Sequence, residues 1–138
     1  MQDRILIDAG PLIALFHIGD NHHKRIREFF KGKEYQFIST LAVLTEVSHF
    51  LSININAVRD FYEWVIHKGV IISDINQNDM PRILDLVVKY QDLPMDLADA
   101  TLVVAAEKTG IRKIISLDSD FDIYRLPGKE QIKNVYKV

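Results

Sequence analysis

The stretch RILIDAG, residues 4–10, indicates the fold class of this chain. Its apolar run ends at Asp8 and is followed by a glycine, which is typical of a buried strand that stops at the aspartate. The stretch KIISLD, residues 113–118, repeats this pattern and ends at Asp118. Between the two stretches, short apolar runs alternate with helical patterns. This alternation favours an α/β fold in which helices cover both faces of a parallel sheet.

The other strands and the helices follow from apolar spacing and from turn residues. Pro11 suits the first turn of a helix, Ser39 or Thr40 can cap the helix that follows, and Gly69 and Gly110 each end a helix. The last strand is expected at an edge of the sheet. The predicted strands are 35–40, a buried run at 70–73, and 132–138, and the predicted helices are 11–16, 20–33, 41–52, 56–69, 77–91 and 95–110.

The composition predicts one globular domain that occupies residues 1–138. Apolar residues make up 48% of the chain and the formal net charge is −2. This mild acidity means that binding of nucleic acid would need a local basic patch or a metal ion that holds phosphate. The absence of cysteine excludes disulfides and thiolate metal sites. Because no run resembles a secretory signal or approaches the ~18 apolar residues of a membrane span, we expect a cytoplasmic protein.

Acidic residues recur where an open α/β sheet binds ligands, which is beyond the carboxyl ends of its strands. One acid follows the first strand, one lies in the helix at 41–52, two lie three residues apart at the start of the helix at 95–110, and two follow the strand at 113–118. Residues three apart share one helix face. These acids are Asp8, Glu46, Asp96, Asp99, Asp118 and Asp120.

Unpaired carboxylates repel one another, so such a group is stable chiefly when protons or a cation neutralise it. Mg²⁺ and Mn²⁺ prefer oxygen ligands. A bound ion of this kind polarises a phosphate and lowers the pKa of a water molecule, which suits phosphodiester hydrolysis. Each acid also has a simpler interpretation: Asp96 can cap its helix, Asp8 can cap a turn, Asp99 can be solvated, and Glu46 can form a salt bridge at a boundary.

Four motifs in order resemble the PIN-domain family, and in particular its VapC-like toxin ribonucleases. The stretch ILIDAGPLIALF is similar to the opening strand with its first acid, Asp8, and STLAVLTEVSHFL is similar to the helix that carries Glu46. The stretch YQDLPMDLADATLVVAAEKTG resembles the helix with the third acid, Asp99, and KIISLDSDFDIYR resembles the strand before Asp118. The resemblance covers roughly residues 5–125.

The resemblance implies a three-layer α/β/α sandwich and Mg²⁺- or Mn²⁺-dependent cleavage of single-stranded or structured RNA. It assigns catalysis to Asp8, Glu46, Asp99 and Asp118, and metal binding to Asp8, Asp99 and Asp118 with Asp96 as an accessory. It also implies a homodimer and an antitoxin protein as partners. One departure is that Ala9 follows Asp8 where the family commonly has Ser or Thr, so hydroxyl support from that turn is lacking.

Two further residues are candidates for substrate binding. Arg125, near the fourth acid, could contact the RNA backbone, although the basic residues of this segment could equally be edge-strand charges. His23, together with Asp20, could shape the rim of the site, since the related proteins often carry Asp and His in this region. A zinc site is disfavoured because the remaining histidines are scattered.

Other functions were weighed against the nuclease. An aspartyl-nucleophile phosphatase needs a second aspartate two residues after the first, and Gly10 occupies that position. A receiver domain needs an acid pair near the first strand and a lysine after a late strand, and neither is evident. A non-catalytic RNA- or protein-binding module stays open as the alternative. Convergence of the four acids within the coordination reach of one ion would distinguish the nuclease from this module.

Overall fold

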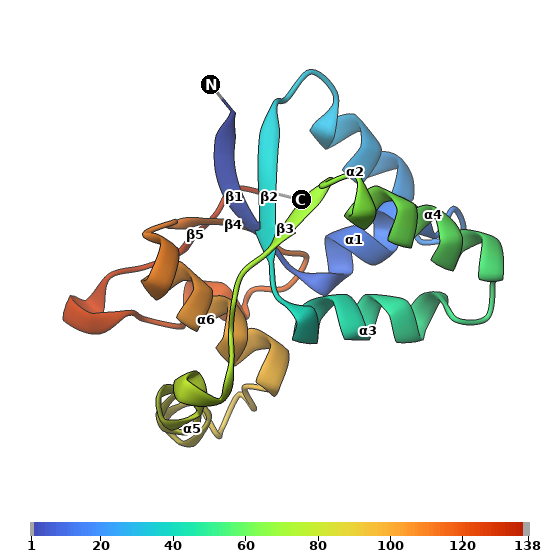
Figure 1. Cartoon of the computed structure of the whole chain (residues 1–138). Coiled ribbons are helices and arrows are strands. Elements are labelled where there is room, and N and C mark those ends of the chain that lie inside the picture. The colour runs from blue at the N-terminus through green and yellow to red at the C-terminus, as the bar shows by residue number, and fades with distance from the viewer. Residues whose placement is uncertain (1, 137–138) are drawn as a thin grey trace.

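The computed structural model describes residues 2–136 and has a sheet of five parallel strands at its centre (Figure 1). The order of the strands across the sheet is β3-β2-β1-β4-β5. Leu6 of β1 lies opposite Ile38 of β2 on one side and Ile114 of β4 on the other. The parallel sheet is therefore confirmed. The strands are β1 (Asp3–Ile7), β2 (Tyr35–Ser39), β3 (Val70–Ile72), β4 (Lys113–Ile115) and β5 (Lys133–Asn134).

Helices cover both faces of this sheet, which confirms the three-layer α/β/α architecture. Figure 1 shows α1 to α4 on one side and α5 and α6 on the other, with α3 also meeting α6 near one edge of the sheet. The helices are α1 (Ala9–Phe16), α2 (His23–Phe30), α3 (Leu41–Leu51), α4 (Ile55–Ile66), α5 (Met80–Lys89) and α6 (Leu97–Thr109). Three short 3₁₀ helices complete the described chain, at Gln77–Asp79, Asp120–Asp122 and Pro127–Lys129.

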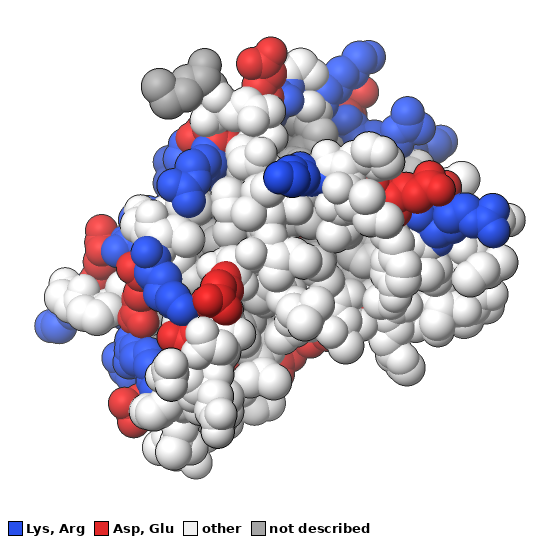
Figure 2. Space-filling view, in the orientation of Figure 1, with Lys and Arg blue, Asp and Glu red and all other residues white. Residues whose placement is uncertain are grey.

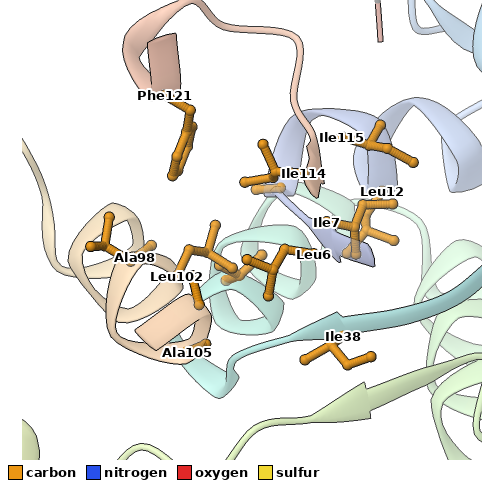
Figure 3. Close-up of a cluster of buried hydrophobic side chains, with 14 of the residues drawn as sticks. Leu6, Ile7, Leu12, Ile38, Ala98, Leu102, Ala105, Ile114, Ile115 and Phe121 are labelled. Carbon is orange, nitrogen blue, oxygen red and sulfur yellow. The ribbon is translucent and has the colours of Figure 1, made fainter. Parts of the chain in front are cut away.

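The core is built on the two central strands and on α6 (Figure 3). Leu6 and Ile7 of β1 and Ile114 and Ile115 of β4 have no solvent exposure. Helix α6 is buried almost all round, because from Ala98 to Ala106 every side chain except that of Asp99 is buried. A helix that is apolar on all sides is held by the core on all sides. The start of α6 is therefore a rigid platform.

Several element boundaries differ from the sequence prediction. Helix α1 begins at Ala9 and not at Pro11, because the side chain of Asp8 accepts a hydrogen bond from the amide of Ala9 and caps the helix. Pro11 then lies in the first turn, where its missing N–H costs nothing. Helix α2 is shorter than the predicted 20–33, and α4 ends at Ile66, three residues before Gly69.

The strands β3 and β5 lie at the two edges of the sheet. The run 70–73 was expected to be buried, but only Val70 is, since β3 lies at the edge and leaves Ile71 and Ile72 37% and 44% exposed. Strand β5 lies at the opposite edge, as expected. Residues 137–138 of the predicted last strand lie outside the described residues. Among residues 2–136, none of the helices has the length and apolar character needed to cross a membrane.

Candidate active site

Six carboxylic acids line one pocket of about 480 Å³, which we call the acidic pocket. They come from the end of β1, the loop after β4, the middle of α3 and the start of α6, and they meet at the carboxyl edge of the sheet. Ala9, Gly10 and Leu117 are among the residues that complete the wall. Every acid singled out in the sequence therefore lines one pocket, but convergence within the reach of one ion is not observed, since among residues 2–136 no three acidic or histidine side chains are placed to hold one ion. The acids are Asp8, Glu46, Asp96, Asp99, Asp118 and Asp120.

Helix caps place three of the acid-bearing segments. Asp8 caps α1, Thr40 caps α3 and thereby sets the position of Glu46 six residues later, and Asp96 caps α6. The hydroxyls of Thr40 and Thr101 lie 2.7 Å apart and join the starts of α3 and α6. The predicted capping roles of Asp8 and Asp96 are confirmed. Asp8 and Asp96 also line the pocket.

A hydroxyl that the sequence reading missed connects the first and fourth acids. Ser116 Oγ donates to Asp8 Oδ2 over 3.0 Å, and it accepts the amide hydrogen of Asp118 over 3.1 Å. The side-chain amide of Asn134 holds the backbone of Ser116 on both sides, at its N–H and its C=O. Ala9 has no hydroxyl to support Asp8, and Ser116, directly after the neighbouring strand β4, supplies one. A lone serine at the end of an apolar strand was the only sequence signal for it.

Asp96, Asp99 and Asp118 are each held by one hydrogen bond to one carboxylate oxygen. Asp96 Oδ1 accepts the amide of Asp99 at 2.8 Å, and Asp118 Oδ1 accepts the amide of Asp120 at 2.7 Å. Asp99 Oδ2 accepts the hydroxyl of Tyr124 at 3.1 Å, a contact that the sequence did not suggest. The second oxygens of Asp99 and Asp118 accept no hydrogen bond from residues 2–136.

Burial and mutual repulsion raise the pKa of four of these acids. Burial, assisted by the charges of Asp118 and Asp96, raises the pKa of Asp8 to about 6 against the opposing bonds from Ala9 and Ser116. Partial burial of the Glu46 carboxyl, and the charges of Asp96 and Asp8, raise its pKa to about 7. Burial and the same two neighbouring charges raise the pKa of Asp99 to about 7. The pKa of Asp120 is also raised, by burial and then by Asp118.

No cation of the protein neutralises the acidic pocket in the part of the chain that is described. None of its lining residues is Lys, Arg or His. The four salt bridges between described residues use Glu107, Asp79, Glu130 and Asp3, all outside the pocket. A group of carboxylates with raised pKa values and no basic partner is typical of a functional site.

The donor set of the acidic pocket fits a hard divalent cation, since all of its ionisable ligands are carboxylates. Among residues 2–136, no three acidic or histidine side chains are already arranged as ligands of one ion. Mg²⁺ is commonly bound through only one or two carboxylates, with water completing its coordination. The oxygens of Asp99 and Asp118 without internal partners are consistent with that type of binding.

The structure does not bring the two predicted substrate-binding residues to the acidic pocket. His23 begins α2, its Nδ1 lies 2.7 Å from the carbonyl oxygen of Ala14, and it borders a separate surface hollow with Lys24 and Arg27. The guanidinium of Arg125 donates to the carbonyls of Asp122 and Tyr124 in its own loop. Their part in binding a substrate stays a prediction.

The sequence and the fold are similar to those of known proteins. The sequence profile of the PIN domain family matches residues 5–126. The chain is 22% identical over 116 residues to Ribonuclease VapC26 of Mycobacterium tuberculosis, an alignment that covers 83% of this chain and 86% of the relative. Its fold is similar to the crystal structure of M. tuberculosis VapC20, described as a sarcin-ricin loop cleaving toxin. That match has a TM-score of 0.77 at 19% identity and covers 86% of this chain and 93% of VapC20.

Proposed function

This chain belongs to the PIN domain family, and from that premise we propose that it is a divalent-metal-dependent endoribonuclease and the toxin of a toxin–antitoxin pair. The observation that carries the proposal is the acidic pocket. Acids from four separate segments meet at the carboxyl edge of the sheet without a basic partner among the described residues. Because such a group is stable chiefly when protons or a cation neutralise it, and a bound cation can in turn hold a phosphate, the pocket suits a polyanionic substrate.

The choice of RNA as the substrate is supported by the relatives. VapC26 is a ribonuclease by name, and VapC20 is described as a sarcin-ricin loop cleaving toxin. We infer the substrate class from them and not the RNA target, since both are below 25% identity. The number of acids supports an active enzyme: all four positions that the family uses for catalysis carry a carboxylate in this chain.

We give the acids the roles that the resemblance to the PIN-domain family implies. Asp8, Asp99 and Asp118 would hold Mg²⁺ or Mn²⁺, with Asp96 as an accessory ligand. The bound cation would polarise the scissile phosphate and stabilise the leaving oxygen. Glu46 would accept a proton from the attacking water, because a pKa of about 7 suits a general base at neutral pH. Ser116 would keep Asp8 and the loop that carries Asp118 in register.

Cleavage of RNA by the purified protein tests this function. Wild-type protein, Asp99→Asn and the control Asp60→Asn are incubated with single-stranded RNA and with structured RNA, in Mg²⁺, in Mn²⁺ and in chelator. Asp60 is an exposed acid of α4 outside the pocket. We expect cleavage by the wild type and the control in either metal, and none in chelator or by Asp99→Asn. Absence of cleavage under every condition would favour the non-catalytic RNA- or protein-binding module instead.

The protein partners, an antitoxin and a second copy of the chain, are also proposals. They are supported by an open groove of about 590 Å³ between α3 and α4, lined mainly by apolar side chains, of which Leu41, Tyr62 and Ile66 are 65%, 48% and 72% exposed. Figure 2 shows that the surface over α3 carries almost no charged side chains. Exposed apolar surface of this kind is typical of contacts with other proteins. Light scattering of the purified chain tests the homodimer.

A further inference from the structure

Tyr124 is a buried tyrosine that joins the loop after β4 to the start of α6. Its side chain has no solvent exposure, and its hydroxyl donates to Asp99 Oδ2 over 3.1 Å. Tyr124 does not line the acidic pocket. It therefore cannot touch a substrate in the pocket, and its contact with the site is made through the carboxylate of Asp99.

Two other aromatic side chains pack against the ring of Tyr124. Phe121 packs edge-on against it with ring centroids 5.2 Å apart, and Tyr90 does so at 5.0 Å. The hydroxyl of Tyr90 instead accepts the backbone amide of Arg125 at 2.9 Å, so it takes no part in the ring packing against Tyr124. Edge-to-face packing of this kind restrains the orientation of a ring. The Tyr124 hydroxyl is consequently held at one place beside Asp99.

Asp99 differs from Asp8, Asp96 and Asp118 in that no backbone amide of the described residues restrains its side chain. Asp8, Asp96 and Asp118 each accept an amide hydrogen from a residue one to three positions along the chain. Asp99 is restrained by a hydroxyl from a residue 25 positions away. Its backbone is set by α6, but the direction of its carboxylate depends on the loop that also carries Asp118 and Asp120.

We propose that Tyr124 is a positioning residue that holds one oxygen of Asp99 and leaves the other, Oδ1, for the divalent cation. This inference rests on the proposed function. Hydrogen-bond partners of metal ligands fix the orientation of those ligands, and their loss commonly lowers metal affinity or activity by about 10–100-fold. The hydroxyl of Tyr124 meets this description, and it does so without becoming a ligand itself.

The test compares Tyr124→Phe with Tyr90→Phe. Both variants keep their rings, but only the first loses the bond to Asp99, whereas the second loses a hydroxyl of the same cluster that binds the amide of Arg125. Mn²⁺ binding is measured by calorimetry, and RNA cleavage is measured as a function of Mn²⁺ concentration. We expect the affinity of Tyr124→Phe for Mn²⁺ to fall by about tenfold or more and that of Tyr90→Phe to stay within about twofold of the wild type.

Saturating Mn²⁺ separates positioning from ligation. It should restore most of the cleavage rate in Tyr124→Phe, because the ligand is still present, but none in Asp99→Asn. Should Tyr124→Phe not fold, wild-type protein labelled with ¹³C at the tyrosine ζ carbon provides the second measurement. The Tyr124 signal should shift with Mg²⁺ at the concentration that saturates the binding heat, and the Tyr90 signal should not.

The failures of the two proposals are distinguishable. If the wild type binds Mn²⁺ and Tyr124→Phe binds it equally well, or if the Tyr124 signal does not respond to Mg²⁺, the positioning role is wrong and the nuclease is unaffected. If the wild type binds neither ion and cleaves no RNA, the proposed function fails and takes the positioning role with it.

Discussion

Ser116 Oγ lies 3.0 Å from Asp8 Oδ2 and 3.1 Å from the amide nitrogen of Asp118, so one buried hydroxyl joins the acids that follow β1 and β4. The two strands are neighbours in the sheet, with Ile7 opposite Ile115. This register brings the residue after each strand to the same edge. By binding both groups, the Ser116 hydroxyl holds the carboxylate of Asp8 next to the loop that carries Asp118.

Substitution of Ser116 by alanine should weaken both the site and the fold. The change leaves Asp8 Oδ2 and the Asp118 amide without their partner, and loss of a partner from a buried polar group costs about 1–3 kcal/mol. We also expect cleavage to fall by about 10–100-fold because Asp8 loses its orientation. Thermal unfolding and RNA cleavage measure the two effects. Unchanged cleavage by Ser116→Ala would show that the hydroxyl has no part in the site.

Substitution of Asp8 by asparagine should abolish cleavage and stabilise the metal-free protein at pH 8. Asp8 has a pKa of about 6 in the folded state and an ordinary value of 3.8, so its contribution to stability is complete below pH 3.8 and is lost as the pH rises through 6. The asparagine carries no charge that has to be buried. We expect a gain of about 1–3 kcal/mol at pH 8 from this difference in pKa.

The control for Asp8→Asn is the same measurement at pH 5, where the wild-type carboxyl is protonated in the folded state. The advantage of the variant should shrink there, as followed by urea unfolding in the presence of chelator. An advantage of equal size at both pH values would mean that the effect does not come from the charge of Asp8.

Substitution of Asp96 by serine separates the capping role of this residue from its proposed role as a metal ligand. Serine is as good an N-cap as aspartate, whereas alanine costs about 0.5–2 kcal/mol at such a position. Asp96→Ser should therefore unfold at nearly the wild-type temperature, and Asp96→Ala should unfold at a lower one. If Asp96 is an accessory ligand, both variants should bind Mn²⁺ more weakly. Wild-type affinity in Asp96→Ser would restrict Asp96 to capping.

Binding of a divalent cation should strengthen as the pH rises from 5 to 8. The ion competes with protons for Asp99 and Asp8, whose raised pKa values of about 7 and 6 keep both carboxyls largely protonated at pH 5. The stabilisation that Mn²⁺ gives in thermal melts should be small at pH 5 and large at pH 8. A stabilisation that is independent of pH would place the bound ion away from these acids.

The order of the strands and helices, and the position of each acid along them, were determined by the sequence alone. The apolar run RILI is followed by Asp8, and a charged side chain after an apolar run marks the end of a buried strand. Parallel strands place those ends at one edge, so the meeting of Asp8, Glu46, Asp99 and Asp118 could be predicted without coordinates. The capping residues Thr40 and Asp96 could also be predicted, because a helix cap depends only on residues close by in the sequence.

Only the tertiary structure decided which polar groups hold those acids and which candidates lie elsewhere. Ser116 reaches Asp8 across 108 residues, and Tyr124 reaches Asp99 because two aromatic rings fix its direction. Arg125 looked suitable beside the fourth acid, but its guanidinium is bound to carbonyls of its own loop. Hydrogen bonds between distant segments depend on side-chain packing in three dimensions, and a pattern of residue types along the chain does not record it.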